Sequence, residues 1–381
     1  MGENYPRIAS GTESNYAEQG GLSMFIYAYK TRNGTRQGCT IDSLASVSTA
    51  ESCKTITIEG FTLNVDEKLV INAIENAVIN LQGNIVFTAD PNFKTAGPLF
   101  TLTGTGITFN GNDFTIDGQG AKYWDGLGTA ANAQAKPHPM IKLGCSGTVQ
   151  NFTVLNSPAQ VFSMGNDASL VVSNINIDNS AGDTANSLSG GKPAAHNTDG
   201  FDVSTNDVTI QNSIIHNQDD CVAINKGSNI IFQNNHCTGG HGISIGSVAN
   251  GSTVSNVQIT NNTVTNNVQA LRIKTDAAAQ TGSVSGVTYK DNTATGCTDY
   301  GVIIDQSYPS TLSKITGAGV KISAITFTGT NNIAIASSAK GEVEVNCAHN
   351  GCTGTWDWSG LEVSGGLPGS IVNATIANFK L

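Results

Sequence analysis

The sequence predicts an all-β fold, a single right-handed parallel β-helix of about ten coils with a short N-terminal capping helix. Two observations carry this prediction: the chain is rich in small uncharged residues, and short β-branched segments recur along it. Its 381 residues include 43 glycines, and only 13% are charged. Such a composition suits strands and tight turns better than helices.

The first recurring segment is a β-branched run that alternates with period two and closes on Asn or Asp. It occurs as VTIQN (208–212), IIFQN (230–234), VQITN (257–261) and VTYKD (287–291). Units this short cannot bury a hydrophobic face alone, so they must stack on one another. We expect the recurrent amides to hydrogen-bond along the stack, with Asn151 and Asn261 pointing inward despite the glycosylation sequons that they begin.

A second segment recurs in the same region, and in it a small residue precedes two apolar residues at period two. It reads DGFDVS from 199, DCVAIN from 220, HGISIG from 241, QALRIK from 269 and YGVIID from 300. This pattern indicates strands with one buried face and a tight corner in front of each. Two strand columns and one corner column per repeat, with no helical pattern between them, predict the parallel β-helix.

The N-terminal part of the chain divides at Cys39. Residues 1–38 form an extension of unknown role in which we recognise no secretory signal, and residues 39–381 form the β-helix domain. Residues 40–53 read as a short amphipathic helix that covers the N-terminal end of the coil, where strand edges would otherwise be exposed.

The cysteines and the net charge bear on compartment and partners. The pairs 39/53, 221/237 and 347/352 can each close a small loop, so we predict three disulfides and a secreted protein. Cys145 and Cys297 lie too many coils apart to pair and are predicted to be buried free thiols. A formal charge of −10 argues against nucleic acid, and no apolar run is long enough for a membrane span. We expect a monomer without metal or cofactor.

Stacking would bring acidic side chains together at the corner. Asp199, Asp220 and His241 begin successive repeats, Asp219 adjoins Asp220, and Asn197 lies near Asp199. Three crowded carboxylates cannot all ionise with ordinary pKa values, so one of them is expected to keep a proton. A protonated and an ionised carboxyl side by side are what glycoside hydrolysis requires.

Two cations are expected one repeat further on. Because Leu271 and Ile273 are predicted to be buried, Arg272 and Lys274 should both face outward, on the same face as Asp202. This arrangement indicates a site for an anionic ligand with acid/base chemistry beside it. A structural ion-pair network would produce the same pattern, and Tyr300 alone would be read as a stacking aromatic.

Five of these motifs resemble the fungal polygalacturonases of glycoside hydrolase family 28. They are NTDGFD (197–202), QDDC (218–221), GGHGISIGS (239–247), RIK (272–274) and the tyrosine of DYGV at 300. The resemblance implies an inverting endo-hydrolase of α-1,4-linked galacturonan that acts on pectic polysaccharide. It implies that Asp219 is the general acid, that Asp199 and Asp220 activate the water, and that His241 supports the acid. It further implies that the substrate is bound by Asn197, Arg272, Lys274 and Tyr300.

Other functions remain open on the sequence. A β-helical polysaccharide-binding protein would need a groove and cations but no carboxylates that share a proton. A calcium-dependent pectate lyase would cleave by elimination and fail in chelator. Among hydrolases, a rhamnogalacturonan enzyme and an exo-acting polygalacturonase are the nearest alternatives.

Overall fold

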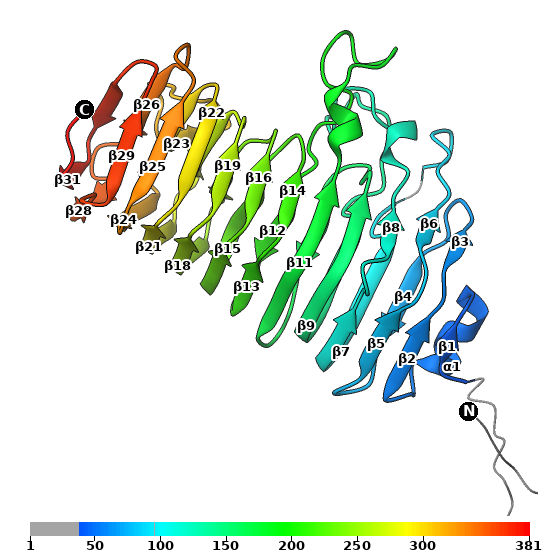
Figure 1. The fold of residues 1–381 in the computed structure, drawn as a ribbon. Coiled ribbons are helices and arrows are strands. Elements are labelled where there is room, and N and C mark those ends of the chain that lie inside the picture. The colour runs from blue at the N-terminus through cyan, green and yellow to red at the C-terminus, as the bar shows by residue number, and fades with distance from the viewer. Residues whose placement is uncertain (1–37, 95) are drawn as a thin grey trace, which may run out of the picture. The chain divides into compact units, whose positions relative to one another are not determined.

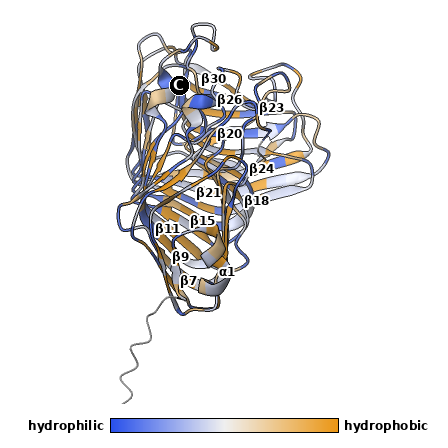
Figure 2. Cartoon of the chain, turned by 90° about the vertical axis from the view of Figure 1, so that its right-hand side faces the viewer, coloured by the Kyte–Doolittle hydropathy of each residue, from blue (hydrophilic) through white to orange (hydrophobic). Residues whose placement is uncertain are grey.

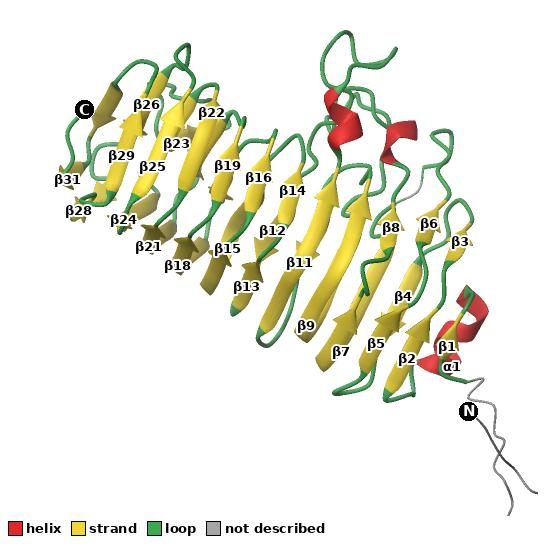
Figure 3. Ribbon diagram, viewed as in Figure 1, coloured by secondary structure: helices red, strands yellow, loops and turns green. Residues whose placement is uncertain are grey.

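The computed structural model describes residues 38–94 and 96–381, and within them the chain winds through three ladders of parallel strands (Figure 1). The predicted extension over residues 1–38 therefore lies, apart from Gly38, outside the described residues. Strands dominate the described residues, and helices occur among them only as short turns (Figure 3). The prediction of an all-β parallel coil is confirmed.

Each ladder stacks one strand per coil in parallel register. The first ladder comprises β1 (Thr40–Ile41), β2 (Thr55–Ile58), β5 (Val78–Leu81), β7 (Phe100–Asn110), β9 (Ile141–Leu155), β11 (Leu170–Asp178), β13 (Val208–Gln211), β15 (Val222–Gln233), β18 (Ser252–Thr260), β21 (Gly282–Lys290), β24 (Val320–Thr328) and β27 (Cys352–Thr353). The second comprises β3 (Phe61–Leu63), β6 (Ile85–Phe87), β8 (Thr115–Asp117), the ends of β9 and β11, β14 (Ile214–His216), β16 (His236–Thr238), β19 (Thr263–Thr265), β22 (Thr293–Cys297), β25 (Asn331–Ile335) and β29 (Leu361–Ser364).

The third ladder carries the residues that matter for function. It comprises β4 (Leu69–Asn72), the first halves of β7 and β9, β10 (Phe162–Met164), β12 (Phe201–Ser204), the start of β15, β17 (Ile243–Val248), β20 (Gln269–Asp276), β23 (Tyr300–Tyr308), β26 (Gly341–Asn346) and β30 (Gly369–Val372). A separate pair, β28 (Thr355–Asp357) and β31 (Thr375–Ala377), lies near the C-terminus.

The helical turns are η1 (Leu44–Ser46), α1 (Val47–Ala50), η2 (Gly120–Lys122) and η3 (Ser180–Asp183). The first two show that the N-terminal cap is shorter than the predicted helix over 40–53. Thr40 and Ile41 pair with β2 instead, because their backbone groups complete the first ladder. Val47 and Ala50 are buried, so the helix covers the core as expected.

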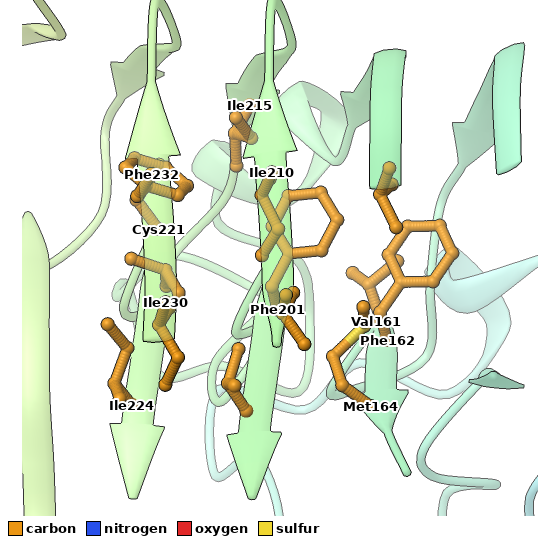
Figure 4. Close-up of a cluster of buried hydrophobic side chains, with 14 of the residues drawn as sticks. Val161, Phe162, Met164, Phe201, Ile210, Ile215, Cys221, Ile224, Ile230 and Phe232 are labelled. Carbon is orange, nitrogen blue, oxygen red and sulfur yellow. The ribbon is translucent and has the colours of Figure 1, made fainter. Parts of the chain in front are cut away.

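Period-two alternation fills the interior with stacked apolar side chains. Hydrophobic stretches run along the strands and alternate with polar positions (Figure 2). The rings of Phe162 and Phe201 on adjacent coils are stacked with centroids 5.1 Å apart (Figure 4). Side chains of one kind thus repeat along the axis, as the register of the repeats predicts.

The recurrent Asn residues stack as predicted, but neither Asn151 nor Asn261 is buried, and both take the left-handed bend before a buried residue. Asn261 is exposed and adopts the left-handed backbone conformation with φ 54°, which asparagine tolerates at sharp bends. Its amide donates to Asn234 at 2.7 Å, and the amide of half-buried Asn151 donates to Asn110 at 3.1 Å.

The buried amide ladder consists of the residues that follow the bend. Asn235, Asn262, Asn292 and Asn331 are each at most 2% exposed. Each of the first three donates its backbone N–H to the side-chain oxygen of the next, at 2.9–3.1 Å. These side chains therefore satisfy backbone groups that the bend leaves unpaired.

The disulfides follow the predicted pairing. Cys39 is bonded to Cys53, Cys221 to Cys237 and Cys347 to Cys352. Cys145 and Cys297 are buried free thiols, also as predicted. No described helix is long and apolar enough to cross a bilayer.

Candidate active site

Strand register places Asp199, Asp220 and His241 on successive rungs of the third ladder. In this ladder Phe201 pairs with Val222, and Val222 pairs with Ile243. Each of the three site residues lies two positions before one of these paired residues. Neighbouring rungs are about 4.8 Å apart. The geometric part of the prediction is confirmed: residues distant in sequence lie side by side on one wall.

Glycine allows the corners to approach this closely. A Cβ atom on Gly200 would lie 2.5 Å from the carbonyl oxygen of Cys221. Gly242 has φ 84°, and a Cβ atom there would lie 2.1 Å from the carbonyl oxygen of Gln269. Backbone contact between coils therefore requires glycine at these two positions.

Asp219 is buried and accepts three hydrogen bonds. Its Oδ1 atom lies 2.9 Å from Nδ1 of His241 and accepts a hydrogen bond from the backbone N–H of Asp220 at 2.8 Å. Its Oδ2 atom accepts a hydrogen bond from Nδ2 of Asn197 at 2.9 Å. The backbone N–H of Thr129 donates to Oδ1 of Asn197 at 3.1 Å, which turns the Asn197 amide donor towards Asp219. A loop outside the repeats thus orients a side chain of the site.

Asp219 and His241 stabilise each other's charged forms. Burial acts to raise the pKa of Asp219, but the hydrogen bond and charge of His241 hold it well below its ordinary value. Burial likewise acts to lower the pKa of His241. The hydrogen bond from His241 to Asp219 outweighs burial, so the pKa of His241 is raised on balance. The pair is therefore a proton donor that retains its proton to higher pH than a free imidazole.

Asp220 is fully buried and is held by a cation. Lys274, itself 7% exposed, donates from Nζ to Oδ2 of Asp220 at 2.6 Å, and the Ser244 hydroxyl donates to Oδ1 at 2.6 Å. Burial acts to lower the pKa of Lys274, and the charge of Asp220 raises it on balance. Lys274 was expected to face outward as a ligand-binding cation, and its buried pair with Asp220 instead matches the ion-pair network that the sequence left open as an alternative.

Asp199 and Asp202 complete the carboxylate cluster. Burial first, and then the charge of Asp219, raise the pKa of Asp199 well above its usual range. Burial and the neighbouring Asp220 raise the pKa of Asp202 to about 7. Asp202 was not among the predicted site residues, although its outward position on β12 was the available signal; Ser244 and Thr129 carried no comparable signal.

Arg272 and Tyr300 lie on the next rungs along the same wall. Arg272 pairs in register with Ser244 and with Ile303, and its Nε atom is buried with no hydrogen-bond partner among the described residues. Tyr300 pairs with Gln269 and is 9% exposed, and burial raises the pKa of its phenol. An unpaired guanidinium donor beside a carboxylate cluster suits an anionic ligand.

A metal ion has a potential place in the cluster. Ligand atoms of Asp219, Asp220 and His241 all lie within 4.8 Å of one another. The Lys274 ammonium already supplies a positive charge to Asp220. A cavity of about 300 Å³ borders His241, and its lining includes Lys192, His196 and Gln218.

Comparisons with known proteins agree with one another. The sequence profile of "Glycosyl hydrolases family 28" matches residues 48–380. A polygalacturonase of Fusarium fujikuroi is 38% identical over 87% of this chain and 90% of that protein. An endo-polygalacturonase of Sclerotinia sclerotiorum is 41% identical over 85% of this chain and 82% of that protein. The solved structure of endopolygalacturonase I from Stereum purpureum, complexed with two galacturonate, is 48% identical with a TM-score of 0.84, covering 89% of this chain and 98% of that one.

Proposed function

The chain belongs to glycosyl hydrolase family 28, and from this premise we propose that it hydrolyses α-1,4-galacturonosyl linkages inside polygalacturonate chains. One observation in the structure of this chain supports the proposal independently of the comparisons. The Asp219–His241 pair, the Asp220 carboxylate held by a lysine and an unpaired arginine donor lie on adjacent rungs of one wall.

Asp219 is the general acid. The proton shared between Nδ1 of His241 and Oδ1 of Asp219, 2.9 Å apart, can move to the carboxyl group and from it to the glycosidic oxygen. The pKa of His241 is raised, so the pair keeps this proton under mildly acidic conditions and loses it as the pH rises further. We therefore expect a mildly acidic optimum, and maximal kcat above neutral pH would contradict this role.

Asp220 is the base that takes a proton from the attacking water, with Asp199 beside it. The Lys274 ammonium and the Ser244 hydroxyl both donate to Asp220, which holds its carboxylate in place beside Asp199. Asp199, whose pKa is raised, can hydrogen-bond to the same water and orient it. Attack from this side by water displaces the leaving group with inversion, as the family resemblance implies.

The substrate is bound by the polar side chains around this centre. Arg272 offers its unpaired donor to a uronate carboxylate, and Asn197 and Tyr300 contact the sugar. Lys274 reaches the substrate carboxylate from its position against Asp220. A carboxylate on the substrate suits these two cations better than a neutral sugar does, which ranks a rhamnogalacturonan hydrolase below a polygalacturonase.

The test is the size distribution of products from polygalacturonate over time. Endo-hydrolysis yields oligomers of many lengths early, together with reducing ends and no ultraviolet-absorbing unsaturated ends. Asp219→Asn should lower kcat about 10²- to 10⁴-fold, whereas Asp167→Asn, on an exposed loop, should leave it unchanged. Monomer release from the start would indicate exo action, and an active Asp219→Asn protein would remove Asp219 from the acid role.

The remaining expectations belong to the same proposal. The coil is right-handed, the usual hand for parallel crossovers, and has about ten turns. The protein works outside the cell, which the three disulfides support. It acts as a monomer on pectic polysaccharide, with neither metal nor cofactor.

A further inference from the structure

We propose that the two ends of the substrate groove select different forms of the uronate: the end towards the N-terminus takes a free carboxylate, and the end towards the C-terminus takes an esterified one. This inference rests on the proposed function. It concerns the residues on either side of the cluster.

The outward positions of the third ladder form a straight row, here called the outer row. In order it contains Thr101, Lys142, Ser163, Asp202, Ala223, Ser244, Arg272, Ile303, Glu344 and Ser370. Its charged members are Lys142, Asp202, Arg272 and Glu344. Lys142 lies two rungs before Asp202 and Glu344 two rungs after Arg272, each about 10 Å away. Ala223, Ser244 and Ile303 in the middle of the row are buried, so a linear polymer that crosses the site along the axis would meet the row at its accessible ends, with the cation Lys142 at one end and the anion Glu344 at the other.

The N-terminal end of the row carries unneutralised positive charge. Lys142 is exposed and has no ion pair or hydrogen bond within residues 38–94 and 96–381. A cavity of about 330 Å³ at the same end is lined by residues that include Lys94, Thr129 and His138. Since Thr129 also donates to Asn197, this cavity adjoins the candidate active site. An ionised uronate carboxylate is the substrate group that such an end attracts.

The C-terminal end places a carboxylate next to the tyrosine that is proposed to contact the sugar. A Cβ atom on Gly341 would lie 3.0 Å from Oε1 of Glu344 and 3.4 Å from Cδ1 of Tyr300, so both side chains lie over this glycine. Glu344 has no cation partner in the described part of the chain, and its Oε2 accepts the Ser370 hydroxyl at 2.7 Å. The negative charge of Glu344 therefore lies beside Tyr300 at this end of the row.

A free uronate carboxylate beside Glu344 would meet like charge, and a methyl ester removes the repulsion without changing the sugar ring. Half-exposed charge pairs contribute modest free energies, so the preference at each end should be about two- to fivefold. The two ends thus act in opposite senses on the same polymer. We therefore expect efficient action on partly esterified pectin, at places where a block of free uronates meets a block of esterified ones.

The experiment compares Lys142→Gln and Glu344→Gln on two substrates, unesterified polygalacturonate and partly methyl-esterified pectin. We expect Lys142→Gln to lower kcat/KM on the unesterified polymer about threefold and so to raise the esterified-to-unesterified ratio. Glu344→Gln should raise kcat/KM on the unesterified polymer by a similar factor and lower that ratio. Lys290→Gln on β21 and Glu362→Gln on β29, exposed on the other two ladders, are the matched controls.

Binding is measured in parallel by affinity electrophoresis in gels that contain each polymer. This arm does not depend on turnover, so it separates the two proposals. A wild-type protein that releases no reducing ends contradicts the proposed function, while opposite mobility shifts of the two variants would still support the groove assignment. Ratios that move in the same direction, or that stay at the values of the two control variants, would overturn it.

Discussion

Replacing Lys274 by methionine should destabilise the fold and silence the site through one identifiable contact. The Lys274 ammonium donates to Asp220 at 2.6 Å, Asp220 is fully buried, and the Tyr308 ring lies 5.4 Å from the same ammonium. Methionine keeps the volume and the apolar stem but removes the charge. Asp220 would then be a buried carboxylate with a single remaining side-chain donor, the Ser244 hydroxyl.

The expected loss is set by the unpaired charge rather than by the lost contact. Breaking a buried ion pair from one side costs about 3–5 kcal/mol, whereas replacing both partners by neutral groups is often close to neutral. We therefore expect Lys274→Met to lower the free energy of unfolding by about 3–5 kcal/mol. The double variant Asp220→Asn/Lys274→Met should recover most of that stability and no activity.

The assay is urea unfolding at about pH 6. It compares the wild type with Lys274→Met, Asp220→Asn and the double variant, and Lys290→Met at an exposed position is the control. The pKa of Lys274 is raised above 10.5, so its contribution is complete at any pH below that value and is lost only as the pH rises through the higher folded-state pKa. The reasoning is refuted if Lys274→Met unfolds like the wild type, or if the double variant is no more stable than Lys274→Met alone.

Three further predictions concern the same wall and the core beneath it. The pKa of Asp219 is lowered below 3.8 and that of His241 is raised above 6.5, so their pair stabilises the fold fully between pH 3.8 and 6.5 and less outside this window. The substitution His241→Gln should therefore lower the thermal midpoint most near pH 5. An equal loss at about pH 9 would contradict the pairing. Because the pKa of Asp202 is raised to about 7, its charge is unfavourable at higher pH, and Asp202→Asn should melt higher than the wild type at about pH 8 but not below about pH 3.8. Asn262→Ala would leave the backbone N–H of Asn235 without its acceptor at a cost of about 1–3 kcal/mol, measured by urea unfolding; an unchanged midpoint would show that another group takes its place.

The recurrent segments predicted the vertical register because period-two alternation and a small corner residue are local requirements of a stacked coil. Once Phe201, Val222 and Ile243 are placed inward on successive coils, the position of Asp199, Asp220 and His241 follows. The three disulfides were predictable for a similar reason, since each closes a short loop.

Other features depended on the exact path of the backbone at its bends. Asn261 was expected to point inward, but it occupies a left-handed bend, and the next residue, Asn262, faces the core instead. A shift of one residue at a bend exchanges inside and outside. Pattern alone does not show which of two adjacent asparagines takes the strained position.

By itself, the sequence determined which residues share a wall of this protein, because strand alternation and coil spacing are encoded in neighbouring residues. The tertiary structure alone decided which charges pair on that wall: Lys274 with Asp220, His241 with Asp219, and the Thr129 loop with Asn197. Such pairing depends on side-chain reach and burial across coils, and residues 54 positions apart in the chain carry no local signal of it.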